Sequence, residues 1–327
     1  MTLHESKHAG YTDLGRLHQH FIGEPPLPAP APPFPQVPGG PTPPITAQVV
    51  AAQVASQASR RPQRALYKHA DLGSLRAGGG GRPPSGEDQD CFDLLARLAE
   101  PEAWSSQGDP TWVLREYVEW TFERLHQQRQ VPTSPDGAYS VFNTGLATPQ
   151  QETVFGLFAP NRNPDGPPWQ FAGWLAESDR QLLSTFPELP GYACYTETPS
   201  DFVYDSRREL TVSPKHLLES QENLGTLPDP LRSNPYQAGL VLEGAIRRAE
   251  ARVRRSYRAA VPSWDPLSEK VQLLLPLSLT TPETVDVALV VTQEGESYRG
   301  QVMLGLDLAY ARARQIARPE EWLNGRG

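Results

Sequence analysis

Arginine is the residue type in this chain that most clearly suggests a chemical role. Between Leu240 and Ala260, six arginines stand against two glutamates, a local charge of +4. On a helix with about 100° between residues, the apolar side chains of this segment fall on one side and most arginines on the other. The arginines on that second side are Arg247, Arg248, Arg254, Arg255 and Arg258. Because guanidinium groups bind phosphates through paired hydrogen bonds, this face predicts contact with RNA or with a phosphate-bearing nucleotide. A solvated face that pairs with nearby carboxylates is the alternative interpretation.

His216 is the only histidine after residue 126, and its position suits proton transfer. Ser213 as N-cap and Pro214 as the first helical residue predict that His216 lies in the first turn of a helix. The helix dipole disfavours a charged imidazole there, so a neutral acid/base group is expected, beside a lysine that can hold an anion. Asn223 follows on the same face and is a candidate ligand contact. An exposed histidine with no chemical role is the alternative.

Three other polar positions interrupt apolar blocks. Asn143 and Thr144, with Gly145, follow an apolar strand, where an amide and a hydroxyl can face a ligand. Ordinary turn chemistry is the alternative interpretation of these residues. Asp307 stands where strand periodicity changes to helix periodicity, which suits either a helix N-cap or a catalytic carboxylate.

Metal and cofactor signals are weak. Asp201 and Asp205 are four residues apart, but two carboxylates without a third ligand nearby favour surface acids or caps over a metal site. The chain has no phosphate loop, no Gly-x-Gly-x-x-Gly, no nucleophile elbow, no His-Glu-x-x-His and no Cys-x-x-Cys. These absences disfavour common ATPase, Rossmann, hydrolase and zinc-protease classes, and the residues identify no cofactor.

The charge distribution limits how nucleic acid can be bound. Residues 1–90 hold eight Lys and Arg against seven Asp and Glu, whereas the remaining residues hold 22 against 31. The larger part of the chain is therefore acidic, within a net charge of −8. Binding of duplex over a broad surface is not expected, and any contact must use a local basic patch.

The sequence also predicts where the protein is located. The longest largely apolar run, Val271 to Leu279, contains Pro276 and is far shorter than the ~18 residues of a spanning helix. The first thirty residues lack a basic start followed by an apolar stretch, so no secretory signal is expected. Two cysteines, Cys91 and Cys194, form no disulfide framework. We therefore expect a cytoplasmic protein without a membrane segment.

Proline content divides the chain into a tail and one folded domain. Eleven of the 35 prolines fall between Pro25 and Pro44, where no apolar periodicity exists. Residues 1–62 are therefore predicted to be a disordered, proline-rich tail, and residues 63–327 a single domain. Within the tail, Tyr11 to Ile22 has helical apolar spacing and could recruit a protein partner. A Gly-rich surface loop is expected near residues 78–88.

Helical and strand-like patterns alternate in blocks over the folded part. The clearest helix opens at Asn234-Pro235 and is predicted to reach about Ala259. Helices, a β-meander, more helices and a final β-unit indicate an α+β fold with a largely antiparallel sheet. Other predicted helices cover 92–98, 110–128, 178–186 and the residues after 307, and predicted strands cover 139–143, 153–158, 169–174, 271–279, 286–292 and 297–306.

Several segments occur in an order that is similar to a known family. They are Phe142-Asn-Thr-Gly-Leu146, Phe158-Ala-Pro-Asn161, Tyr204-Asp205, His216-Leu-Leu with Asn223, Arg254-Arg255-Ser-Tyr-Arg258-Ala, Leu273-Leu-Leu-Pro-Leu277, Asp286-Val-Ala-Leu-Val-Val291 and Leu306-Asp-Leu-Ala-Tyr310. This string resembles a bacterial family of unknown function, the DUF3825 type, some of whose members are joined to cold-shock-like RNA-binding modules. The resemblance covers about Ala65 to Leu323. Ser256 departs from it, since the family usually has an asparagine there.

The resemblance implies a bacterial cytoplasmic protein with a connection to RNA or nucleotides, and it supplies no catalytic residues. Two hypotheses follow. In the first, the arginine helix binds RNA or a nucleotide, and His216 with Asp307 processes a phosphoester. In the second, the protein is a non-catalytic scaffold whose proline-rich tail recruits a protein partner. The first hypothesis predicts that the arginines, His216 and Asn143 meet at one cleft.

Overall fold

The computed structural model describes residues 64–73, 90–104, 106, 108–319 and 323. The chain divides into two units, Met1–Pro44 and Ile45–Gly327, and every described residue belongs to the second. The predicted tail over residues 1–62 and the predicted Gly-rich loop near 78–88 lie outside the described residues. They therefore stay predictions.

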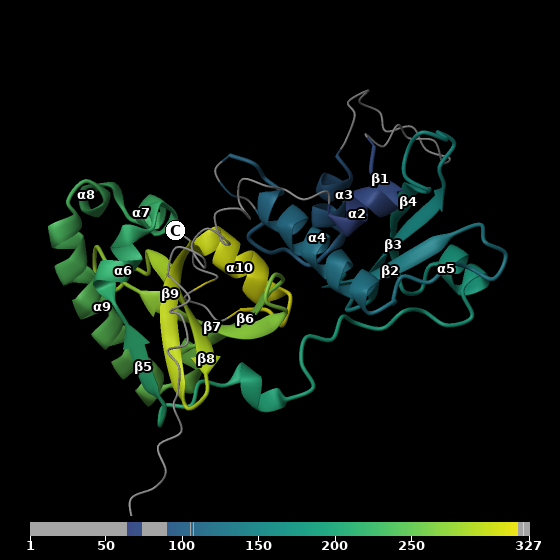
Figure 1. Cartoon of the computed structure of the whole chain (residues 1–327). Coiled ribbons are helices and arrows are strands. Elements are labelled where there is room, and N and C mark those ends of the chain that lie inside the picture. The colour runs from purple at the N-terminus through teal and green to yellow at the C-terminus, as the bar shows by residue number, and fades with distance from the viewer. Residues whose placement is uncertain (1–63, 74–89, 105, 107, 320–322, 324–327) are drawn as a thin grey trace, which may run out of the picture. The chain divides into compact units, whose positions relative to one another are not determined.

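The first half of the described chain forms a four-stranded sheet with the order β1-β4-β3-β2 (Figure 1). Its strands are β1 (Ala70–Asp71), β2 (Ser140–Ala147), β3 (Thr153–Pro160) and β4 (Trp169–Ala176). The helices of this half are α2 (Ala65–His69), α3 (Cys91–Leu98), α4 (Trp112–Gln127) and α5 (Arg180–Thr185). The β2-β3 and β3-β4 pairs are antiparallel, and the short β1 pairs with β4 in parallel.

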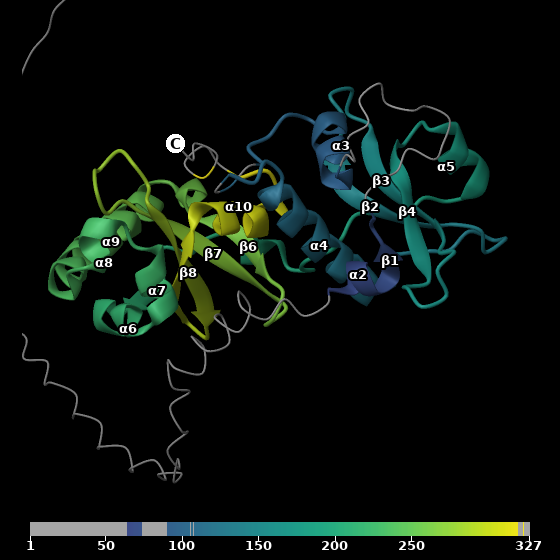
Figure 2. The ribbon, with the colours of Figure 1, turned by 90° about the horizontal axis from the view of Figure 1, so that it is seen from above.

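Alternation along β2 and β3 sends side chains to two different apolar layers. Phe142 and Phe158 join the cluster that contains the buried face of α4. Val141 and Leu157 join a second cluster with Leu182 of α5. The sheet therefore lies between α4 and α5, as Figure 2 shows.

The second half forms a five-stranded sheet with the order β5-β9-β8-β7-β6. Its strands are β5 (Glu209–Val212), β6 (Val261–Asp265), β7 (Lys270–Leu277), β8 (Val287–Glu294) and β9 (Ser297–Gly305). Its helices and 3-10 turns are η1 (Pro199–Phe202), α6 (Pro214–Glu219), α7 (Gln221–Thr226), α8 (Asp229–Arg232), α9 (Pro235–Arg255), η2 (Tyr257–Ala259) and α10 (Leu306–Arg314). All pairs are antiparallel except β5 with β9.

The two faces of this sheet carry different helices. Leu273 and Leu275 of β7 share a cluster with the apolar stripe of α9. Leu274, between them, belongs to the cluster that contains Ala309 and Tyr310 of α10. Since neighbouring strand residues point to opposite faces, α9 and α10 cover opposite faces of the sheet (Figure 1).

The architecture confirms the predicted α+β class and its mostly antiparallel pairing, but it contains two sheets instead of one. Two helix starts are also confirmed, because Ser213 and Asn234 each accept a hydrogen bond from the backbone of the first turn. The start of α4 differs from the prediction. Thr111 is its N-cap, and Asp109 caps the preceding turn by accepting from Thr111 N at 2.9 Å.

Candidate functional site

The helix that carries the arginines, α9, is amphipathic and ends earlier than predicted. Its apolar stripe, which includes Leu242, Ala249 and Val253, is buried against the five-stranded sheet. The helix stops at Arg255 because Ser256 adopts an extended conformation, with φ −147° and ψ 103°. The predicted continuation to Ala259 is therefore wrong.

This early end moves two residues off the helix. Tyr257 and Arg258 belong to the 3-10 turn η2, so the helical geometry that put Tyr257 on the apolar side and Arg258 on the basic side does not apply to them. Tyr257 is instead 56% exposed. An aromatic ring thus stands in solvent between Arg255 and Arg258.

The arginines of α9 differ in how they are used. Arg247 pairs with Glu243 and Arg254 with Glu250, each at 2.6 Å and four residues along the helix. Arg248 donates to the backbone oxygen of Ser278 at 2.7 Å. Within the described part of the chain, the exposed Arg252 and Arg255 have no acidic partner. These two guanidinium groups are therefore available for a phosphate.

A small cavity of about 220 Å³ adjoins the end of α9. Its lining includes the aromatic rings of Phe202 and Tyr257 and the guanidinium-bearing residues Arg258 and Arg318. The side chain of Arg318 is 57% exposed, with its nearest carboxylate, that of Glu100, 4.0 Å away. We call Arg252, Arg254, Arg255, Tyr257, Arg258 and Arg318 the arginine surface.

The segment before β5 lies close to this surface. Burial raises the pKa of Tyr204 to about 12, with a further rise from Glu250 and an opposing effect of Arg254, so the phenol lies near that ion pair. The Tyr204 ring stacks on that of Tyr298, with centroids 4.6 Å apart. Hydrogen bonds from Arg207 lower the pKa of Asp205 to about 2, which keeps this carboxylate charged and paired. Asp205 also accepts a hydrogen bond from the backbone N–H of Arg207 at 3.1 Å, within its own turn.

The structure does not bring His216 to the arginine surface. His216 is exposed in the first turn of α6, where its backbone N–H donates to Ser213 Oγ at 3.4 Å. Leu218 of the same helix packs near Gly239, at 3.7 Å from where a Cβ would stand. Gly239 precedes Arg254 by about 22 Å along the axis of α9, at ~1.5 Å per residue. His216 lines neither the cavity that Tyr257 and Arg258 share nor the cavity lined by Leu218 and Gly239.

The side chain of Asn223 is engaged with the protein backbone. Asn223 is buried, its Nδ2 donates to Gln301 O at 3.1 Å, and its Oδ1 accepts from Met303 N at 2.8 Å. Both ends of the amide therefore hold β9 to α7. This arrangement gives Asn223 a structural task, whereas the sequence suggests a ligand contact.

Asn143 and Thr144 are also engaged, and they lie inside β2, not at its end. Asn143 Nδ2 donates to Pro190 O at 3.2 Å, and Thr144 Oγ1 donates to Val154 O at 2.6 Å. The pairing of β2 with β3 shifts register after Asn143, and Gly145 takes a φ of +72° there. The predicted turn is therefore a bulge in a continuing strand. These residues belong to the four-stranded sheet and do not line the small cavity at the end of α9.

Asp307, which the sequence suggests as an N-cap or a catalytic carboxylate, lies in the first turn of α10 and is not the cap. Gly305 is the N-cap of this helix. The Asp307 carboxylate accepts a hydrogen bond from Ser106 Oγ, which joins α10 to the segment before α4. Neither residue lines the cavity beside Arg258.

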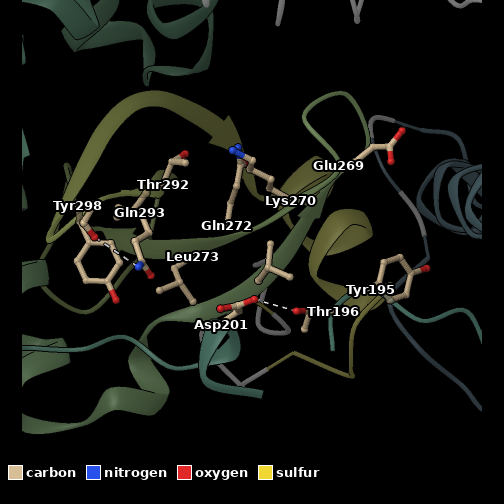
Figure 3. Close-up of a pocket in the computed structure, with 13 residues that line it drawn as sticks. Tyr195, Thr196, Asp201, Glu269, Lys270, Gln272, Leu273, Thr292, Gln293 and Tyr298 are labelled. Carbon is tan, nitrogen blue, oxygen red and sulfur yellow. Dashed lines mark hydrogen bonds between the residues drawn. The ribbon is translucent and has the colours of Figure 1, made fainter. Parts of the chain in front are cut away.

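A second cavity near the arginine surface contains residues that sequence reasoning did not select. It measures about 380 Å³ and lies where β7, β8 and β9 meet the chain before η1. Figure 3 shows Asp201 with Thr196 on one side, and Lys270 with Gln272 on the other. We call it the polar cavity. The sequence contains one indication of this cavity, because Lys270 is one of only four lysines in the chain.

Two general properties of the described residues also bear on function. No group of three or more His, Cys, Asp or Glu side chains within them is arranged to hold a metal ion. None of their helices combines the length and hydropathy that crossing a bilayer requires.

Comparison with known proteins identifies the family. A family model described as Domain of unknown function (DUF3825) matches residues 95–322. The chain belongs to this family. The DUF3825 region contains the arginine surface, the polar cavity, His216 and Asp307, whereas α2 precedes it. A comparison with curated proteins gives no match, and neither does a comparison with solved structures.

Proposed function

We propose that this protein binds single-stranded RNA through the arginine surface at the end of α9. The observation that carries the proposal is the exposed ring of Tyr257, which has Arg255 before it and Arg258 after it in the chain. Guanidinium groups contact phosphates, and an exposed aromatic ring stacks on a base. The combination of both groups is typical of surfaces that bind single strands.

The charge of the chain favours a single-stranded ligand over a duplex. Outside the arginine surface the chain is acidic, so a long duplex would meet repulsion on both sides of a small basic patch. A stacking ring also requires bases that are free of a paired strand. A short unpaired segment satisfies both conditions.

Helix stabilisation explains part of this surface, but it leaves Tyr257 unexplained. Arg252, Arg254 and Arg255 lie in the last turn of α9, where positive charge complements the helix dipole by about 0.3–1 kcal/mol each. This effect requires no aromatic ring beyond the end of the helix. Exposure of a large ring beside these charges is what favours a ligand.

The proposed function is binding alone, without phosphoester processing. His216 is exposed on α6, and Asp307 is hydrogen-bonded to Ser106. Neither lines the cavity that Tyr257 and Arg258 share. The scaffold hypothesis depends on the proline-rich tail, which lies outside the described residues, and it stays a prediction.

Binding should be tested by fluorescence anisotropy with a labelled 12-nucleotide RNA at several salt concentrations. For a single strand, the slope of log K against log salt falls by ~0.7 for each phosphate contact. The double variant Arg252→Gln, Arg255→Gln removes two such contacts and should make this negative slope shallower by about 1.4. Tyr257→Leu should weaken binding by about 1–3 kcal/mol and leave the slope unchanged.

A matched control is available in the first half of the chain. Arg162 and Arg180 are exposed and far from α9 in sequence, so Arg162→Gln with Arg180→Gln removes equal charge elsewhere. This control should keep the slope of the unmodified protein. Absence of RNA binding at low salt, or equal loss in the control, would refute the proposal.

A further inference from the structure

We propose that a second copy of this chain docks on the cavity that Leu218 and Gly239 line, in a two-fold dimer that also pairs β5 with β5 of the second copy. The cavity has a volume of about 850 Å³. It extends along α9 from Tyr236 to Glu250, a length of ~21 Å at ~1.5 Å per residue. Its other wall is formed by α6 and β5. We call it the α9 groove.

The residues that line the α9 groove lie on matching faces of their elements. At ~100° per residue, the lining residues of α9 fall within an arc of about 140°, next to the buried stripe of the helix. On β5, Leu210 and Val212 line the groove and pack against the same apolar cluster as that stripe. Glu209 and Thr211, which alternate with them, are exposed. The groove therefore lies on the face of the five-stranded sheet that α9 covers, at the β5 edge.

The strand β5 has a free edge. It is the last strand in the order β5-β9-β8-β7-β6, so it has a neighbouring strand on one side only (Figure 1). Within the described part of the chain, the backbone of β5 is hydrogen-bonded to β9 and to no other segment. Unpaired amide and carbonyl groups at a sheet edge favour pairing with another extended strand.

The helix wall of the α9 groove exposes two large apolar side chains. Tyr236 is 79% exposed, and Leu240, one turn later, is 57% exposed. Gly239 lies between them, and its missing side chain keeps the groove open beside Leu218, whose Cδ1 is 3.7 Å from where a Cβ would stand. Contact with an apolar surface of another molecule would remove these side chains from water.

A second copy supplies both of the groups that this surface lacks. It brings an unpaired β5 edge and, on the same face of its sheet, the apolar side chains of its own α9. A two-fold axis perpendicular to the sheet makes the two β5 edges antiparallel and leaves both α9 helices on one face. A separate helix or a separate extended peptide would satisfy only one of the two requirements.

The alternation of side chains predicts the register of the β5 pair. Opposite residues in antiparallel strands point to the same face, so Leu210 can lie opposite Val212 of the second copy. This register joins apolar side chains beside the groove and places Thr211 opposite Thr211 of the second copy, on the other face. Other registers of the same parity are worse. They place Val212 opposite Arg208, or Leu210 opposite Pro214, which has no backbone donor.

The charges in the groove also suit a second copy. Its lining contains two cations and three anions, so it has little net charge to attract a strongly charged partner. Glu243 and Arg247 carry opposite charges, and their side chains are 53% and 77% exposed. Because the two-fold axis makes the α9 helices antiparallel, Glu243 of each copy can face Arg247 of the other. Ion pairs of this kind determine orientation more than affinity.

The size of the surface predicts a dimer that dissociates on dilution. Fourteen residues line the groove, and Glu209 and Thr211 of β5 bring the surface to 16. Standard interfaces use ~20–30 residues on each side. The surface is therefore slightly smaller than a permanent interface requires.

Sedimentation velocity of the full chain at increasing concentration tests the dimer. The mass should rise from that of one chain to that of two. Tyr236→Lys and Leu240→Glu should each raise the dissociation constant at least about tenfold, because each places a charge in an apolar contact. Leu183→Glu on α5 is the matched control, since Leu183 is 59% exposed, and it should leave the dissociation constant unchanged. Circular dichroism checks that each variant is folded.

A disulfide tests the strand pairing. Thr211→Cys, in a chain that also carries Cys194→Ser, places two thiols on opposite residues of antiparallel strands, at a Cα separation of ~4.5–5.5 Å that a disulfide can span. The remaining Cys91 is buried. Oxidation with copper phenanthroline should therefore give a covalent dimer. Ala172→Cys, at an exposed position of β4, is the matched control and should stay monomeric under the same conditions.

Each result has a definite meaning. The mass of one chain at every concentration overturns the proposal. A dimer that Tyr236→Lys and Leu240→Glu leave intact, or that gives no crosslink through Thr211→Cys, also overturns it, because another surface then joins the copies. A dimer that only the α9 variants dissociate, together with the crosslink, supports it. Neither measurement contains RNA, so failure here leaves the proposed function intact.

Discussion

Arg314 holds the carboxylate of Glu102 with two nitrogens, Nε at 2.9 Å from Oε2 and Nη2 at 2.9 Å from Oε1. The Tyr310 hydroxyl donates to the same carboxylate at 2.6 Å. The Glu102 side chain is only 1% exposed and that of Arg314 13%. This forked, nearly dry ion pair joins α10 to the segment before α4.

Removing the charge of Glu102 should strongly destabilise the protein. Glu102→Gln would leave Arg314 buried without its counter-charge, which typically costs about 3–5 kcal/mol. Urea unfolding would measure this change in the free energy of unfolding. The control is Glu243→Gln in the exposed Glu243–Arg247 pair, for which a loss below about 1 kcal/mol is expected. Similar losses in both variants would contradict the importance of burial.

Replacing Asn223 should reduce stability, because its amide holds the backbone of β9. Asn223→Ala would leave Gln301 O and Met303 N without these partners, with an expected loss of about 2–3 kcal/mol. His216→Ala, at an exposed position nearby in sequence, should change stability by less than about 0.5 kcal/mol. If Asn223→Ala unfolds at the same denaturant concentration as the unmodified protein, the structural task assigned to Asn223 is wrong.

The two cysteines should react at very different rates. Burial raises the pKa of the Cys91 thiol to about 12, with Asp90 adding to the effect, whereas Cys194 is exposed. Because the thiolate is the reactive form, a chromogenic disulfide reagent at pH 8 should modify Cys194 quickly in the folded protein. Cys91 should react only in denaturant. Cys194→Ser should abolish the fast phase, and a fast phase that persists would contradict the assignment.

Stability should fall on acidification partly because of His69. Burial lowers the pKa of its imidazole from 6.5 to about 4, and His126 adds to the shift. Between these pKa values the unfolded chain binds the proton and the folded chain does not. The contribution of His69 to the free energy of unfolding is therefore complete above pH 6.5 and is lost as the pH falls toward 4. We expect this loss to be about 1 kcal/mol, because the partial exposure of the imidazole reduces the effect. Urea unfolding of His69→Gln should show a shallower pH dependence in this window.

Local sequence patterns predicted much of the secondary structure and little of the site. N-caps such as Ser213 and Asn234 can be recognised in the sequence from the residues that follow them. Both helix starts were therefore predicted correctly. The end of α9 was missed because Ser256 is not a helix-breaking residue type, and its extended conformation accompanies the turn into β6. Lys270 and Asp201 were not expected to share a cavity, since only the strand pairing and η1 bring them together.

Asn143 shows why polar residues within apolar blocks were overestimated as ligand contacts. An amide among apolar neighbours signals a hydrogen-bonding need, but the pattern does not reveal whether a ligand or the backbone meets it. Here Pro190 O and Gly145 N meet it. Asn223 is a second example. Pro190 in the first case, and Gln301 and Met303 in the second, are too distant in sequence to be predicted from a local pattern.

The position of α10 in the chain has a consequence for synthesis. This helix supplies Tyr310 and Arg314 to a carboxylate 208 residues or more earlier in the chain, and its alanines join the cluster around α4. A growing polypeptide therefore lacks the counter-charge for Glu102 until α10 has left the ribosome. We expect the first half to wait in an incompletely packed form during translation, and nascent chains stalled before Leu306 to depend most on chaperones.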